Sequence, residues 1–263
     1  MAGVWRRGFL PIAGLLTAAA WLALWVWGGS PYGRYLDHGN WTRTGLGAHI
    51  CAALPAAGWV LPATLYAAGW LLMTAAMMLP TVVPLLDRFD RLVGDRADRG
   101  LLTALIIACY LLAWLAFAIA AHFLDAALRA AAAQSEWLSF NSWIIGSLIL
   151  AAAGLFQFSA LKYHCLRRCR TPFSFIAKHW HGLRPLGDAL RLGLDHGVFC
   201  VGCCWAIMLL MFVVGSGSVG WMLALALLMA LEKNTPWGPR LSRPLGGALL
   251  AGAVTLVAVH LWG

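Results

Sequence analysis

Seven long apolar runs dominate the sequence, at residues 9–28, 62–86, 101–124, 142–161, 193–214, 218–231 and 246–262. Most of them approach the roughly 20 residues that an α-helix needs to cross the hydrocarbon core of a bilayer. Of the 263 residues, 62% are hydrophobic and only 11% are charged, whereas soluble domains carry about 25% charged residues. The pattern predicts an all-α fold, a polytopic transmembrane helical bundle of about seven spans, with residues 1–263 forming a single integral membrane domain.

Two segments fit this pattern less well than the others. The run at 218–231 is short for a full crossing, and residues 45–60 are apolar but contain Pro55 and several glycines. Because proline interrupts a helix, we expect an interfacial or re-entrant segment at 45–60 and not an eighth span. Arg6 and Arg7 precede the first run in the manner of a twin-arginine signal, but no small-residue cleavage site follows. We therefore expect an uncleaved first span.

The positions of the basic residues predict the orientation of the chain. Sixteen of the 19 Lys and Arg residues lie before the first run or in the segments after the second, fourth and sixth runs; Arg34, Arg43 and Arg129 are the others. Cytoplasmic loops carry such an excess of basic residues. We therefore expect the N-terminus in the cytoplasm and the chain in a bacterial inner membrane. On this interpretation the net charge of +9 reflects orientation in the lipid bilayer and indicates no nucleic-acid partner.

Four motifs with polar or sulfur-containing side chains interrupt the apolar pattern. They are residues 70–80 with Met73, Met77 and Met78, residues 157–172 with Lys162, His164, Cys165 and Cys169, residues 196–208 with His196, Cys200, Cys203, Cys204 and Met208, and the pair Glu232-Lys233. The predicted topology places all four at or near the cytoplasmic leaflet, on four different helices. We expect them to build a single site.

The cysteines of the second and third motifs have helical spacing. Cys200, Cys203 and Cys204 stand at positions i, i+3 and i+4, so they share one face of a helix. Cys165 and Cys169 form an i, i+4 pair if the helix continues to residue 172. Five thiols on the cytoplasmic side indicate metal ligation or redox chemistry. A structural disulfide is disfavoured there because the compartment is reducing.

Methionine, histidine and acidic side chains near these thiols extend the candidate metal site. Thiolate and thioether ligands suit a soft ion, which favours copper(I), and zinc is the alternative if histidine takes part. The additional candidate ligands are Met77, Met78, Met208, His164, His196 and Glu232. For any single methionine, filling a gap in the helix packing is the competing interpretation.

These motifs resemble those of the DUF2182 family, described as predicted metal-binding integral membrane proteins. The resemblance rests on M-x-x-x-M-M-x-P at 73–80, C-L-x-x-C-R-x-P at 165–172, H-G-x-x-C-x-G-C-C-W at 196–205 and Glu232-Lys233. It covers about residues 65–235. It implies a polytopic, metal-binding membrane protein and supplies no established reaction.

The leading functional hypothesis is a membrane protein that binds copper(I) for handling, delivery or transport. A metallochaperone or a membrane metalloenzyme would be a suitable partner. The sequence has no Gly-rich phosphate loop, HExxH motif or nucleophile elbow, which favours a non-enzymatic role. Two alternatives stay open: a thiol–disulfide or electron-transfer protein in which Cys203 with Cys204, or Cys165 with Cys169, cycles, and a non-catalytic assembly subunit.

Overall fold

A computed structural model describes residues 2–30, 60–94, 96–141, 143–214 and 219–262, and these residues form helices joined by short connections. The helices are α1 (Ala2–Gly28), α3 (Val60–Val93), α4 (Arg99–Gln134), α5 (Glu136–Phe140), α6 (Trp143–Phe156), α7 (Ala160–Arg170), α8 (Pro172–His179), α9 (Pro185–Val214), α10 (Val219–Asn234) and α11 (Gly238–Trp262). The prediction of an all-α chain is confirmed for the described residues. Of the expected interfacial or re-entrant segment 45–60, residues 45–59 lie outside them and Val60 begins α3.

Within the described residues, four helices are long and apolar enough to cross a membrane. They are α3, α4, α9 and α11, and the bent pair α6–α7 raises the number to five if the pair forms one span. The predicted runs at 9–28 and 218–231 correspond to α1 and to the 16-residue α10. Seven crossings therefore stay a prediction, while the membrane-spanning character of the central helices follows from their length and hydropathy.

The fourth predicted run, 142–161, is not one straight helix. Helix α6 ends at Phe156 and α7 begins at Ala160, with a bend of 63° between them. The backbone N–H groups of Gln157, Phe158 and Ser159 each bond to the carbonyl three residues earlier, which tightens the last turn. The Ser159 hydroxyl then accepts a hydrogen bond from the Lys162 N–H and caps α7. The polar residues at the break thus end one helix and start the next.

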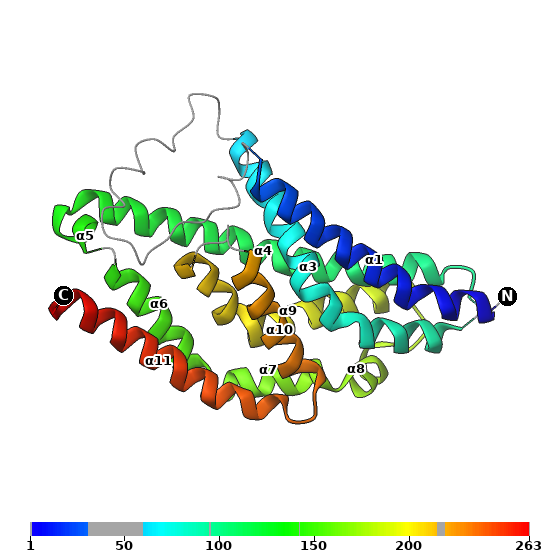
Figure 1. Ribbon diagram of the computed structural model, residues 1–263. Helices are drawn as coiled ribbons and strands as arrows, with labels where there is room; N and C mark the ends of the chain where they lie inside the picture. The colour runs from blue at the N-terminus through cyan, green and yellow to red at the C-terminus, as the bar shows by residue number, and fades with distance from the viewer. Residues whose placement is uncertain (1, 31–59, 95, 142, 215–218, 263) are drawn as a thin grey trace.

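Helix α9 lies at the centre of the molecule and packs closely against α4 (Figure 1). Two glycines of α9 make this approach possible. A Cβ atom added to Gly193 would lie 2.5 Å from the Ile106 carbonyl oxygen, and one added to Gly197 would lie 2.7 Å from the Cβ of Ala113. Any larger side chain at Gly193 would push the two helices apart, because the contact is with backbone.

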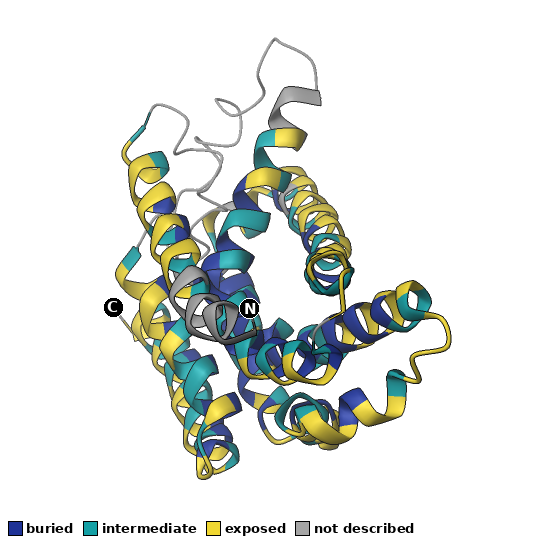
Figure 2. Cartoon of the chain, turned by 90° about the vertical axis from the view of Figure 1, so that its right-hand side faces the viewer, coloured by how far each residue is buried: buried dark blue, intermediate teal, exposed yellow. Residues whose placement is uncertain are grey.

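The helices bury the faces that they turn toward one another and expose apolar faces outward (Figure 2). Leu112 on α4 and Val254 on α11 are 57% and 68% exposed, and many other large apolar side chains share this position. A soluble monomer rarely shows apolar surface on this scale. The outward faces are therefore suited to contact with lipid.

The two ends of the chain lie at opposite ends of the molecule. Helix α1 starts at the end where α3 connects to α4, whereas α11 finishes at the other end, near α5 (Figure 1). The arginine-rich connection after α3 and the basic start of α1 are thus on one side. Which side faces the cytoplasm stays a prediction.

Candidate functional site

The three cysteines of α9 lie in the buried core. Cys200, Cys203 and Cys204 are at most 1% exposed and share the α9 face predicted from their spacing. The Cys203 and Cys204 sulfurs are 3.4 Å apart. The Cys203 thiol also lies 3.2 Å from the Cys200 carbonyl oxygen, to which it donates a hydrogen bond.

Helix α7 brings a fourth thiol to this group. It is continuous through Cys165 and Cys169, as predicted, and the Cys169 sulfur lies 3.9 Å from the Cys203 sulfur. Gly202 permits the approach of α7 to α9, because a Cβ atom there would lie 2.7 Å from the Cys165 sulfur. Cys169 is half-buried while Cys203 is fully buried, so the pair reaches from near the surface into the core.

Cys200 connects the cluster to side chains of α3, α4 and α10. Its sulfur lies 2.8 Å from the Lys233 ammonium and 3.0 Å from the Tyr110 hydroxyl. Lys233 also lies 3.3 Å from the Thr81 hydroxyl and 3.8 Å from the Met78 sulfur. Sequence reasoning missed Tyr110 and Thr81, because single polar residues in apolar helices carry no distinguishing spacing.

Glu232, a candidate ligand, is engaged in a separate network. Its carboxylate accepts hydrogen bonds from the Lys162 ammonium at 2.9 and 3.0 Å and from the Ser242 hydroxyl at 2.8 Å. Lys162 also donates to the side-chain carbonyl of Gln157. The Arg170 guanidinium donates to the backbone carbonyl of Glu232 at 2.5 Å. This network ties α7 to α10 and α11 and occupies the Glu232 carboxylate with Lys162 and Ser242.

The four sequence motifs therefore meet, with different roles for their members. Met78 and Cys200 contact Lys233, and Cys169 joins from α7 through its contact with Cys203. The remaining candidate ligands lie in three different environments. Met77 and Met208 are buried in the core, His164 is exposed beside Phe199, and His196 is buried between the rings of Tyr110 and Phe175. Among the described residues, the His196 Nδ1 atom has no hydrogen-bond partner.

The sulfur spacing fits a metal held by two thiols. With a metal–sulfur bond of about 2.3 Å, two ligands lie roughly 3.8 Å apart at a tetrahedral angle and roughly 4.6 Å apart when opposed. The Cys169–Cys203 distance of 3.9 Å falls within this range. In the part of the chain that the structure describes, no group of three or more His, Cys, Asp or Glu side chains is arranged to hold an ion. A pair of thiols at this separation suits a soft ion.

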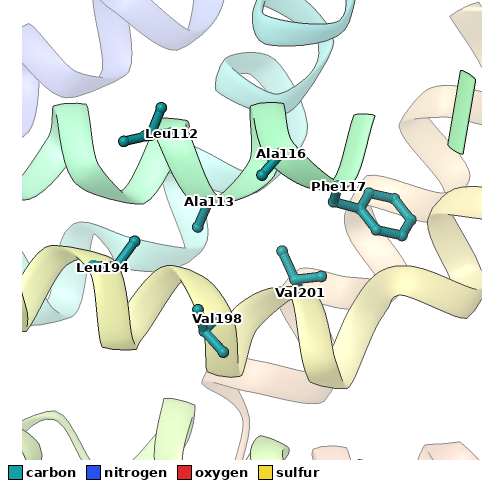
Figure 3. Close-up of a pocket in the computed structure, with 7 residues that line it drawn as sticks. All are labelled: Leu112, Ala113, Ala116, Phe117, Leu194, Val198 and Val201. Atoms are coloured by element: carbon teal, nitrogen blue, oxygen red, sulfur yellow. The ribbon is translucent and has the colours of Figure 1, made fainter. Parts of the chain in front are cut away.

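A pocket of about 480 Å³ lies between α4 and α9, apart from the thiols (Figure 3). Its walls include Ala113, Phe117, Leu194 and Val198, and all of its lining side chains are apolar. Val198 is 56% exposed on the outward face of α9. Because no lining side chain can ligate a metal, the candidate metal site is the thiol cluster and not this pocket.

Comparison with known proteins identifies one family. The model of the PpoB2 family, described as a copper chaperone, matches residues 67–256, which include all four motifs. No curated protein and no solved structure gives a match. The resemblance to the DUF2182 family stays a prediction. Since the match extends over well more than half of the chain, the protein belongs to the PpoB2 copper chaperone family.

Proposed function

We propose that this chain is an integral membrane copper chaperone that carries copper(I) as cargo on thiols supplied by α7 and α9. The observation that carries the proposal is the 3.9 Å separation of the Cys169 and Cys203 sulfurs, which come from different helices and lie at a metal-bridging distance. Soft thiolate ligands favour Cu(I), zinc and iron–sulfur clusters over harder ions. The family match supports copper as the ion.

The gradient of burial suggests a route for the cargo. Cys169 is half-buried and serves as the entry ligand, Cys203 and Cys204 are buried next to it, and Met78 lies deeper beside Lys233. Two-thiol coordination leaves positions open on the ion. An incoming sulfur ligand can then replace an outgoing one without a bare ion forming, which is what transfer to a partner requires.

The cellular setting follows from the orientation argument. We place the N-terminus and the thiol cluster on the cytoplasmic side of a bacterial inner membrane, with seven spans that include α1 and α10. A soluble metallochaperone or a membrane metalloenzyme is the partner class that this position serves. Arg167 and Arg168, in the last turn of α7, place positive charge close to Cys169 and suit an acidic partner surface.

The test is a measurement of bound metal on the purified full chain in detergent under reducing, anaerobic conditions. After reconstitution with Cu(I), we expect about one copper per chain by mass spectrometry, because the cluster offers one pair of bridging thiols. The double variant Cys169→Ser/Cys203→Ser is expected to lose it. Cys109→Ser is the matched control, because Cys109 lies on α4 and packs beside Gly193, seven residues before Cys200 on α9. A wild-type chain without copper would refute the proposal.

Thiol–disulfide exchange is the second candidate function, favoured by the same pair of sulfurs. Cys169 and Cys203 need to approach by about 2 Å to reach the disulfide bond length. Counting free thiols in oxidised and reduced samples distinguishes the two functions. A loss of two thiols on oxidation that Cys169→Ser abolishes, together with no copper binding, would establish the redox role.

A further inference from the structure

The buried charges of the described residues do not balance. Three charged side chains are buried there, Lys162, Glu232 and Lys233. Lys162 and Glu232 neutralise each other in an ion pair with exposed fractions of 0% and 1%. Lys233, whose side chain lies in the core, leaves a net charge of +1. A buried ion without an opposite charge is strongly unfavourable.

The contacts of Lys233 show what can supply that opposite charge. Its ammonium lies closest to the Cys200 sulfur, at 2.8 Å, followed by Thr81 and Met78. Its charge also acts on Cys204 and Cys203. The oxygens of Glu232 are occupied by Lys162 and Ser242. The groups nearest to Lys233 are therefore thiols and other neutral side chains, and a thiol carries a negative charge only when it is deprotonated.

We infer that Lys233 makes the thiol cluster selective for a monovalent soft cation over a divalent one. This inference rests on the proposed function, because it concerns the same thiols. Two thiols that bind Cu(I) release two protons and form a complex of charge −1, which together with Lys233 gives a neutral core. Two thiolates with Zn²⁺ form a neutral complex, and the charge of Lys233 stays uncompensated.

The arrangement of the ligands does not allow Zn²⁺ to regain charge balance by binding a third thiolate. A third thiolate on Zn²⁺ would restore neutrality, but among the described residues no three His, Cys, Asp or Glu side chains are arranged to hold an ion. The position of Lys233 thus discriminates by ion charge, and the soft sulfur donors discriminate by ion type.

The size of the effect follows from Coulomb's law. The Cu(I) and Zn²⁺ complexes differ by one unit of charge and use the same ligands. Removal of Lys233 therefore changes the ratio of the two affinities by the Coulomb energy between the lysine charge and one further unit charge at the metal site. For two unit charges about 6 Å apart in a medium with an effective dielectric constant of about 20, Coulomb's law gives roughly a hundredfold change in an equilibrium constant.

The experiment measures Cu(I) and Zn²⁺ affinities of the full chain in detergent by anaerobic competition with chelators of known affinity. In Lys233→Met, which keeps the length of the side chain and removes its charge, the preference for Cu(I) over Zn²⁺ is expected to fall roughly a hundredfold. Lys233→Arg keeps the charge and is expected to preserve most of the preference.

A second pair of variants tests the charge without deleting the lysine. Thr81→Asp places a carboxylate beside the Lys233 ammonium, and Thr81→Asn places a neutral group of the same shape there. The preference for Cu(I) is expected to fall in Thr81→Asp relative to Thr81→Asn. This comparison decides the matter even if Lys233→Met does not fold.

The outcomes separate this inference from the proposed function. Wild-type chain that binds no Cu(I) overturns both. The role of Lys233 is overturned, and the copper site left intact, if the wild-type chain binds Cu(I) and Lys233→Met keeps the wild-type preference for Cu(I) over Zn²⁺. The same conclusion follows if Thr81→Asp and Thr81→Asn show equal preferences.

Discussion

The buried ion pair between Lys162 and Glu232 offers a test of the fold that needs no metal. The pair joins α7 to α10, with two N–O distances of 2.9 and 3.0 Å and almost complete burial. Ser242 and Gln157 complete the hydrogen bonding of the two charged groups. Replacement of Lys162 by Met keeps the side-chain length but leaves the Glu232 carboxylate buried without a cation.

The expected cost follows from that stranded charge. Breaking a buried pair by removing one partner costs about 3–5 kcal/mol. The single variants Lys162→Met and Glu232→Gln are therefore each expected to unfold at a temperature lower by roughly 10 °C or more. The double variant leaves no charge behind. Its loss of stability is expected to be clearly smaller than the sum of the two single losses.

The assay is thermal unfolding of the four proteins in one detergent, followed by circular dichroism and size-exclusion chromatography. Near-additive losses would show that the two residues do not interact, and the packing of α7 against α10 would then be misassigned. Single variants as stable as the wild type would refute the claim that the pair is buried away from water.

Two further predictions concern helix packing and pH. Gly193→Ala places a Cβ atom 2.5 Å from the Ile106 carbonyl oxygen and is expected to lower the free energy of unfolding by about 1–3 kcal/mol in thermal unfolding. The control is Gly252→Ala, whose added Cβ meets no atom within 4 Å and which is expected to be neutral or stabilising. Equal effects of the two substitutions would contradict the close approach of α4 and α9. Copper affinity is expected to fall as the pH is lowered, because protons compete with Cu(I) for the thiolates, and a pH-independent affinity in chelator competition would argue against thiol ligation.

The helices follow from local properties of the sequence. Apolar runs of spanning length require backbone hydrogen bonds to be satisfied within the segment, so helices at these positions were predictable. The common face of Cys200, Cys203 and Cys204 follows from the 3.6-residue period of the helix. The break after Phe156 was missed, since it depends on a few hydrogen bonds of residues that also fit an apolar run.

The sequence by itself determined which residues are helical and which thiols share a face, because both depend on interactions within a few residues. Only the tertiary structure decided which groups face each other. Adjacent residues on a helix point about 100° apart, and so Glu232 joins Lys162 while Lys233 joins Cys200. The meeting of Cys169 with Cys203 depends on two helices that approach closely at Gly202. Such contacts arise from long-range packing, and no local spacing records them.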